Sequence, residues 1–204
     1  MNDDPSFQAE ASGDDPARDI RLMERIKTGD MDAFRDLVET HQKRVIGTIA
    51  RMLNDETEAE DIAQQVFIRV WKGAARWEPT AKFTTWLYTI LRNLVFNEFR
   101  RRTRHRTDSL DAAIDDEEHP KQFADGNVKT PDTALLDTEM QDAIERAIAE
   151  LPEAPRMAII MRRYQDVSYE EIGEVLDITV PAVKSLLFRA RTELREKLRT
   201  YLGE

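Results

Sequence analysis

The side chains best suited to chemistry in this sequence lie between Phe83 and Arg102, on what the pattern predicts to be one helix. At 100° per residue, one strip of this helix collects an indole, a hydroxyl, two amides and a guanidinium within about 80° of one another. The strip consists of Trp86, Thr89, Asn93, Asn97 and Arg100. Indoles stack on nucleobases, while amides and guanidinium groups reach base edges and phosphates. The strip predicts a nucleic-acid surface, although alone it is equally compatible with a solvated face carrying one half-buried Trp.

A run of arginines favours the nucleic-acid interpretation. Residues 92–106 contain six Arg and only one acid, Glu98, in a chain of 204 residues whose formal net charge is -10. Local positive charge of this density is the electrostatic signature of a phosphate-binding segment.

The elements that position this strip are predicted to be helices. Leu87, Leu91 and Leu94 form an apolar stripe on a neighbouring face of the same helix, which predicts a core contact. Upstream, a helix is expected to begin at Asp19 or an adjacent residue, residues 28–30 and 54–55 are expected to interrupt the helical pattern, and Thr57 is expected to head the following helix. Residues 73–85 are predicted to be a loop.

The carboxyl-terminal part contains a helix-turn-helix pattern. Pro152 and Pro155 are expected to separate two helices, the second of which runs over residues 156–164. Residues 168–171 form a predicted capping box, a short amphipathic helix follows, and a further helix begins at residues 179–181. One face of that last helix is apolar, at Val183, Leu187, Ala190, Leu194 and Leu198. The opposite face carries Pro181, Ser185, Phe188 and Thr192 among basic residues, as a DNA-reading helix would.

The charge distribution predicts two domains. Residues 1–17 carry five acids and no base, and residues 108–142 carry 11 acids and two bases, with turn formers and no sustained apolar periodicity. Such segments cannot bury enough apolar surface to offset the entropy of ordering. The predicted fold class is all-α, with two small helical domains at 18–107 and 134–204, an acidic flexible linker at 108–133 and a disordered acidic extension at 1–17.

Several classes of function lack support in the composition. The chain has no Cys, no apolar run long enough to span a membrane, and an acidic N-terminus unlike a signal peptide, so we expect a cytoplasmic protein. His41, His105 and His119 are not paired at a metal-ligand spacing, and there is no glycine-rich phosphate loop. The sequence predicts no cofactor, no metal and no enzymatic active site.

Taken together, the chain resembles a bacterial sigma factor of the extracytoplasmic-function group of the sigma-70 family. Four passages carry the resemblance: residues 25–34, residues 59–67, residues 83–93, and residues 168–172 with 183–191. The resemblance implies a protein that binds core RNA polymerase at the clamp helices and the flap, recognises the -35 and -10 elements of promoter DNA, and helps to open the duplex. It also implies an anti-sigma protein as a partner.

The resemblance also implies roles for individual residues. Polymerase binding falls to Asp61, Gln64, Gln65, Phe67 and Arg69. Contact with the -10 element falls to Lys82, Thr85, Trp86, Thr89, Arg92, Asn93, Asn97, Arg100 and Arg101. Contact with the -35 element falls to Ser168, Pro181, Ala182, Lys184, Ser185, Phe188 and Arg189. The linker is either a spacer or, as in the family, a segment that threads toward the RNA channel of the polymerase.

The sequence departs from the family pattern at three places, so the resemblance does not specify which promoter sequence the protein recognises. Asn97 stands where Asp is usual, Pro181–Ala182 replaces Gly-Thr, and Leu186 stands where Arg is frequent. The main alternative is a helix-turn-helix transcriptional regulator that does not act as a sigma subunit. A helical scaffold protein has less support, because it has no use for exposed aromatic rings among cations. A helical hydrolase also has less support, because the carboxylates have no partnered base or metal ligands.

Overall fold

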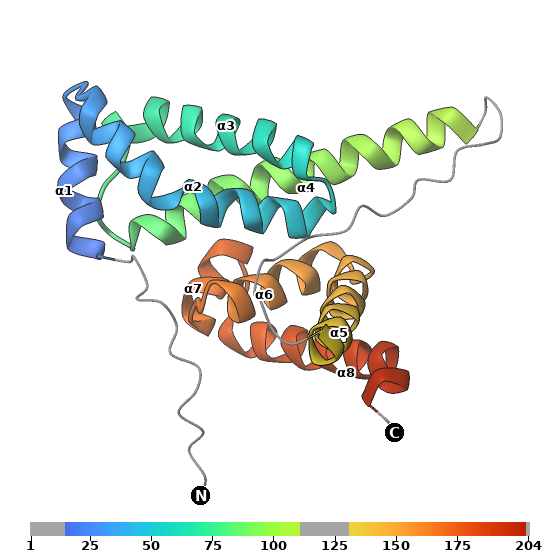
Figure 1. Ribbon diagram of the computed structural model, residues 1–204. Coiled ribbons are helices and arrows are strands. Elements are labelled where there is room, and N and C mark those ends of the chain that lie inside the picture. The colour runs from blue at the N-terminus through green and yellow to red at the C-terminus, as the bar shows by residue number, and fades with distance from the viewer. Residues whose placement is uncertain (1–14, 111–130, 203–204) are drawn as a thin grey trace, which may run out of the picture.

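The computed structural model describes residues 15–110 and 131–202, and within these ranges every regular element is a helix (Figure 1). The elements are α1 (Pro16–Lys27), α2 (Met31–Leu53), α3 (Glu56–Gly73), the 3-10 turn η1 (Ala74–Arg76), α4 (Phe83–Leu110), α5 (Pro131–Ala149), α6 (Glu153–Tyr164), α7 (Tyr169–Leu176) and α8 (Val180–Leu202). The predicted all-α fold class is confirmed. The predicted acidic extension and most of the predicted linker lie outside the described residues.

The first four helices form the N-terminal module, and aspartates begin three of them. Asp15 accepts hydrogen bonds from the backbone N–H groups of the first turn of α1, and Asp30 and Asp55 do the same for α2 and α3. Side-chain acceptors at this position satisfy N–H groups that have no partner within the helix. The predicted break at residues 28–30 is confirmed. The predicted start of α3 at Thr57 was two residues late, because Asp55 is the cap.

The first helix also begins earlier than predicted, at Pro16. Asp19 therefore lies inside α1, where it is buried rather than capping. Its Oδ1 is 2.9 Å from Nε2 of His41 on α2, which is equally buried. This polar pair joins α1 to α2 within the core of the module.

The predicted polar strip lies on α4, and the apolar stripe on the neighbouring face of this helix is in the core as predicted. Leu87, Leu91 and Leu94 are all buried. The helix begins at Phe83, inside the segment predicted to be a loop, because the buried ring of Phe83 anchors its first turn and the N–H of Trp86 donates to the carbonyl of Lys82. The rest of the predicted loop contains η1 and an irregular connection.

The last four helices form the C-terminal module, which contains the predicted helix-turn-helix. Pro155 lies in the first turn of α6 rather than before it; the missing N–H of proline costs nothing there. The capping box at α7 is confirmed, since Ser168 and Glu171 exchange two backbone-to-side-chain hydrogen bonds at 3.0 and 3.2 Å. Asp177, with φ of 58°, ends α7 in the left-handed conformation before α8 begins.

The tight turn between α7 and α8 depends on Gly173, and this gives a stability prediction. A Cβ at this position would lie 2.8 Å from the carbonyl oxygen of Ile178, whose own N–H donates to the carbonyl of Gly173. We expect Gly173→Ala to lower the free energy of unfolding by about 1–3 kcal/mol, because the backbone must shift. Urea unfolding followed by circular dichroism measures the change.

Gly47→Ala is the matched control for this substitution. Gly47 also lies in a helix, but a Cβ there would meet only the end of the Arg51 side chain. Alanine should stabilise α2 by up to about 1 kcal/mol through its higher helix propensity. Equal effects of the two substitutions would contradict the assigned role of Gly173.

The two modules pack directly against each other (Figure 1). Helix α7 lies against α4, while α5 and α6 lie against α2. Helix α8 lies on the side of α7 that faces away from the N-terminal module (Figure 1). The helices also extend further into the predicted linker than expected, since α4 ends at Leu110 and α5 begins at Pro131.

Candidate nucleic-acid interface

A cavity of about 440 Å³ lies between η1, the connection after it and the start of α4. Trp77 and Trp86 form its aromatic wall, with ring centroids 6.4 Å apart, and Thr85 and Thr89 add hydroxyl groups. This volume is in the usual range for small-molecule sites. Aromatic walls with hydrogen-bonding groups at their edges suit a flat heteroaromatic ring such as a nucleobase.

Local packing holds Trp86 in place. Its ring contacts the backbone of Gly73, where a Cβ would lie 3.0 Å from the indole. On its other sides lie the rings of Trp77 and the buried Phe83, 6.4 and 6.0 Å away between centroids. Trp86 is consequently half-buried rather than fully outward, and it presents part of its ring to the cavity. A ring fixed in this way loses little entropy when a base stacks on it.

The polar strip continues along α4 beyond the cavity. Asn93, Asn97 and Arg100 are exposed on successive turns. Arg92 is only half-exposed, with its guanidinium carbon 5.8 Å from the centroid of Phe96. In the described part of the chain, its buried Nε has no hydrogen-bond partner. The structure therefore brings the predicted strip together with the cavity on one side of α4.

Arg101 lies in a different environment from the rest of the predicted -10 residues. It donates to both Glu98 and Glu58 at 2.6–2.9 Å, and Arg102 pairs with the same two carboxylates. These contacts bind α4 to the first turn of α3. The hydrogen bond from Arg101 holds the pKa of Glu98 below its usual value. Arg101 thus has a role within the fold, besides any contact with DNA.

This cluster makes a pH-dependent prediction. Because the pKa of Glu98 is lower in the folded state, the contribution of Glu98 to stability is present above its unfolded-state pKa and is lost as pH falls through the folded-state value. Glu98→Gln should lower the free energy of unfolding by about 1 kcal/mol at pH 7. The difference from wild type should shrink toward zero in urea titrations below about pH 4. A difference that persists unchanged at low pH would contradict this role.

Helix α8 presents the second predicted surface. Pro181, Ala182, Lys184, Ser185 and Arg189 are exposed, and Phe188 is 70% exposed. The opposite face of the helix is in the core, where Val183, Leu187 and Ala190 are buried as predicted. Phe188 therefore presents an aromatic ring to solvent between the basic side chains of Lys184 and Arg189. This face is the outer face of the helix-turn-helix.

Ser168, predicted together with the α8 residues, is half-buried at the start of α7. Its Oγ accepts from the N–H of Glu171, and its own N–H donates to Glu171 Oε2. Its observed role is to cap the helix that supports α8.

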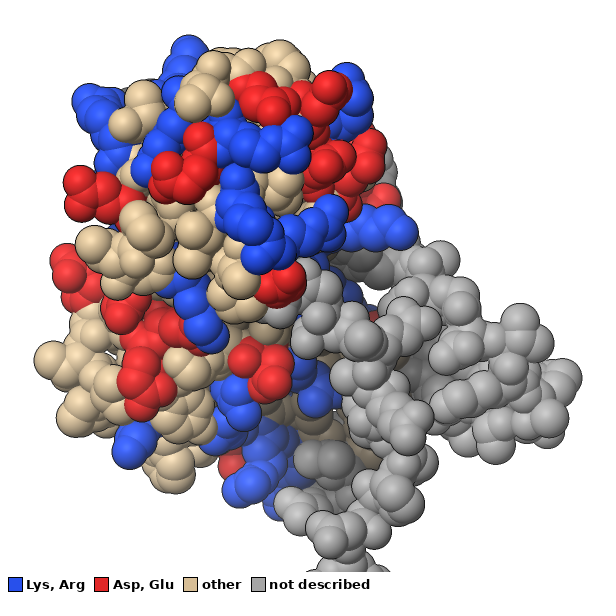
Figure 2. Space-filling view, turned by 90° about the vertical axis from the view of Figure 1, so that its left-hand side faces the viewer, with Lys and Arg blue, Asp and Glu red and all other residues tan. Residues whose placement is uncertain are grey.

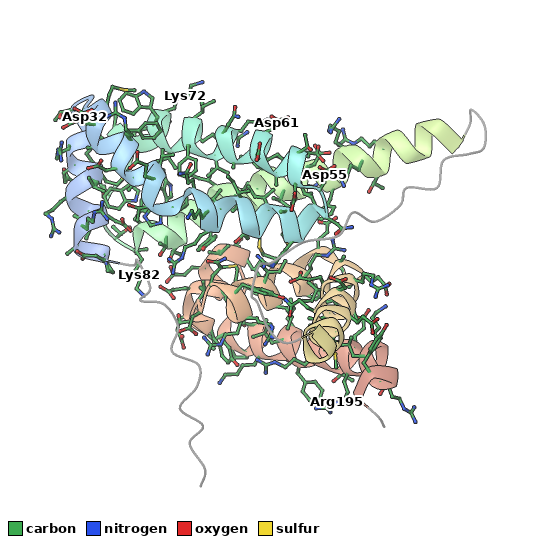
Figure 3. The ribbon with its side chains drawn as sticks, in the orientation of Figure 1. Asp32, Asp55, Asp61, Lys72, Lys82 and Arg195 are labelled. Carbon is green, nitrogen blue, oxygen red and sulfur yellow. The ribbon has the colours of Figure 1, made fainter. Side chains whose placement is uncertain are left out.

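Helix α3 carries the residues predicted to bind polymerase. Asp61, Gln64, Gln65 and Arg69 are exposed, and Asp61 points away from the C-terminal module (Figure 3). Phe67 is 7% exposed and packs in the core, so it supports α3 from within. Its neighbour Ile68, which was not predicted to take part in polymerase binding, is 50% exposed. An apolar side chain flanked by outward polar residues was the available signal.

Charges of both signs mix on the surface, and Lys82, like Arg101, has an acidic partner. Figure 2 shows Lys and Arg interspersed with Asp and Glu on the face that it presents. Lys82, at the junction of the two modules in Figure 3, pairs with Glu171 of α7 at 2.8 Å. Burial raises the pKa of Glu171, but hydrogen bonds from Lys82 and Ser168 outweigh it and hold that pKa below its usual value.

Two further findings apply to the described ranges, 15–110 and 131–202. None of the helices there is both long and apolar enough to cross a membrane. The same residues contain no cluster of three or more His, Asp or Glu side chains arranged to hold a metal ion.

Comparison with known proteins yields two family matches, one in each module. Residues 37–105 match Sigma-70 region 2, and residues 141–194 match Sigma-70, region 4. The chain is 34% identical over 187 residues to the RNA polymerase sigma-H factor of Pseudomonas aeruginosa, covering 92% of this chain and 97% of the relative. It is 35% identical over 183 residues to the ECF RNA polymerase sigma factor SigW of Bacillus subtilis, covering 88% and 96%.

Solved structures show the same fold. The sigma factor RpoE from Bartonella quintana, determined in complex with the anti-sigma factor NepR, aligns with a TM-score of 0.62 at 24% identity, covering 81% of this chain and 96% of that one. CnrH, determined in complex with the cytosolic domain of CnrY, aligns with a TM-score of 0.62 at 22% identity, covering 90% and 98%.

Proposed function

The chain belongs to the extracytoplasmic-function group of the sigma-70 family of RNA polymerase sigma factors, and we propose that its two modules divide promoter recognition between the -10 and -35 elements. In this proposal the chain works in the cytoplasm with core polymerase. The N-terminal module opens the -10 element, and the C-terminal module binds the -35 element.

The observation that carries the proposal is the aromatic cavity beside the polar strip of α4. A base extruded from the duplex costs a few kcal/mol of lost stacking and pairing. Stacking on Trp86 would stabilise the extruded base by about 1–3 kcal/mol, and the hydroxyls of Thr85 and Thr89 would add hydrogen bonds at the base edge. Asn93, Asn97 and Arg100 would hold the strand that leads away from the cavity. Opening then requires no nucleotide hydrolysis.

The exposed face of α8 supports the second half of the proposal. Recognition helices of helix-turn-helix proteins enter the major groove with their N-terminal residues nearest the bases. Here those residues are Pro181, Ala182, Lys184 and Ser185, followed by Phe188 and Arg189. Phe188 would make apolar contact with a base, such as a thymine methyl group, while the cations would bind phosphates or guanine.

The exposed face of α3 would dock on the polymerase clamp. Asp61, Gln64, Gln65 and Arg69 offer polar contacts, and Ile68 offers an apolar anchor between them. We also propose an anti-sigma protein as a partner, because the sigma factor RpoE, which has this fold, was determined bound to the anti-sigma factor NepR.

Run-off transcription with purified core polymerase and genomic promoter fragments tests the function. We expect specific transcripts only when the chain is added, and weak binding of the free chain to the same DNA. A helix-turn-helix regulator would instead bind its site tightly without polymerase. Tight, site-specific binding by the free chain together with no stimulation of transcription would overturn the proposal.

A further inference from the structure

A buried polar pair lies in the core of the N-terminal module, on the two helices that precede the -10 site in the chain. Nε2 of His41 on α2 donates to Oδ1 of Asp19 on α1 at 2.9 Å, and the two side chains are 1% and 4% exposed. Taking such a pair out of water is costly, and apolar side chains of similar volume can join two helices at least as well. Joining α1 to α2 therefore does not by itself account for the pair.

The ring of His41 contacts the aromatic residue that begins α4. Its centroid is 5.2 Å from that of Phe83, with the two planes inclined by 53°. Phe83 is 1% exposed, and it also contacts Trp77 and Trp86, with centroids 6.4 and 6.0 Å away. These two indoles form the aromatic wall of the cavity. Phe83 thus connects the buried imidazole to the wall.

Helix α1 reaches the wall by a second route. Nζ of Lys27, in the last turn of α1, lies 5.6 Å from the ring centroid of Trp77. A cation over an aromatic face is attracted by the ring. Helix α1 also lies beside η1 and the start of α4 (Figure 1). None of the residues predicted to contact the -10 element lies on α1 or α2, so this support comes from outside the predicted site.

Support behind the wall matters because a base stacks best on a ring that is already fixed. Protein cores are packed as densely as organic crystals, so removal of the ring behind Phe83 would leave space into which Phe83 can move. Trp77 and Trp86 would then lose the neighbour that they share. An indole that samples several positions must be immobilised again when a base binds, which weakens binding.

Building on the proposed function, we propose that His41 is a positioning residue of the -10 site. Asp19 orients the imidazole through the hydrogen bond, and the imidazole holds Phe83 in place. Phe83 in turn holds the two indoles that receive the extruded base. Neither His41 nor Asp19 touches DNA; both act through the aromatic wall.

Two double variants separate the ring at position 41 from the polar pair. Asp19→Ala with His41→Leu removes the ring and the pair together. It nearly conserves side-chain volume and leaves no unpaired buried charge, so the module should still fold. Asp19→Ala with His41→Phe also removes the pair but retains an aromatic ring against Phe83. Urea unfolding establishes that both variants are folded under the conditions used.

The first readout is fluorine NMR of the chain labelled with 5-fluorotryptophan, which reports its three tryptophans separately. Trp77 and Trp86 line the cavity, while Trp71 does not and serves as an internal control. We expect the double variant with His41→Leu to broaden the Trp77 and Trp86 resonances at least about twofold, because exchange between ring positions in microseconds to milliseconds widens a resonance. The Trp71 line width should not change, and the double variant with His41→Phe should resemble wild type.

The second readout is promoter opening by the holoenzyme, measured as permanganate reactivity per recruited polymerase. The double variant with His41→Leu should lower opening about 2- to 10-fold, which is the cost of immobilising one side chain expressed as a ratio. The double variant with His41→Phe should stay within about twofold of wild type, and recruitment should change less than about twofold in both.

Equal losses in the two double variants would overturn the inference, because the pair would then act only by joining α1 to α2. Broadening of Trp71 to the same extent as Trp77 and Trp86 would contradict it too, since the whole module would have loosened. So would unchanged line widths at Trp77 and Trp86, or changed line widths with wild-type opening. The line widths are measured without DNA or polymerase. Failure of the wild-type chain to direct transcription would therefore count against the proposed function, and the line widths would still test the positioning role.

Discussion

Trp86→Ala is expected to lower promoter opening about 5- to 100-fold while changing recruitment of polymerase to the promoter by less than about threefold. The range follows from base–aromatic stacking worth about 1–3 kcal/mol, since 1.4 kcal/mol is a factor of ten. Trp86 lines the cavity and is held there by Gly73, Trp77 and Phe83, so its removal takes away a preformed stacking surface. Permanganate reactivity of promoter thymines measures opening, and gel-shift titration of holoenzyme measures recruitment.

Two variants separate stacking from stability. Trp86→Phe retains an aromatic face and should restore most of the opening. Trp71→Ala removes another half-buried indole, which packs on Phe34 with ring centroids 5.1 Å apart and is not among the residues that line the cavity. It should leave opening per recruited polymerase near the wild-type value. An equal loss of opening in Trp71→Ala and Trp86→Ala would mean that the effect comes from folding.

Arg189→Ala should weaken recruitment of the holoenzyme about 5- to 100-fold, because a side chain that contacts a base edge contributes about 1–3 kcal/mol. Arg189 is exposed beside Phe188 near the reading end of α8. The loss should be larger on promoters that contain a -35 element than on fragments in which that element is replaced. Competition gel shifts at fixed salt measure the ratio.

Arg195→Ala is the matched control on the same helix. Arg195 is also exposed, two turns further along α8, and it points away from the N-terminal module (Figure 3). Its removal should change recruitment less than about threefold and equally on both kinds of fragment. If Arg195→Ala and Arg189→Ala lowered recruitment equally, the arginines of α8 would contribute only nonspecific positive charge to DNA binding.

Much of the fold could be predicted because local rules govern it. The stripe of Leu87, Leu91 and Leu94 and the core face of α8 follow from helical periodicity, and the capping box at Ser168 follows from residue types at fixed spacing. Helix starts were less predictable. Asp15 and Asp55 compete with neighbouring polar residues as caps, and the choice depends on the tertiary position of each turn.

The candidate site was predicted in outline but not in its surroundings. Periodicity identified the strip on α4 and the exposed face of α8, because outward positions follow from inward ones. It could not show that Arg101 pairs with Glu58, or that Lys82 pairs with Glu171, since these partners are far apart in sequence. Ile68 is different, since the helical periodicity of the core residues Ile62, Val66 and Val70 places it on the outer face of α3.

Direct packing of the modules was the main feature that the sequence did not predict. An acidic linker suggests separation, yet Tyr88, Gln165 and Thr48 form a hydrogen-bonded chain across the boundary. Such contacts depend on the relative orientation of two folded units, which local patterns do not encode.

The central claim is that one module opens the -10 element while the other binds the -35 element, both as parts of one holoenzyme. Combined DNase and permanganate footprinting of that holoenzyme on a promoter that it transcribes tests this most directly. The account predicts protection over the -35 element and reactive thymines in the -10 element, with the reactivity lost in Trp86→Ala and the protection weakened in Arg189→Ala. A footprint without protection or reactive thymines at either element would contradict it.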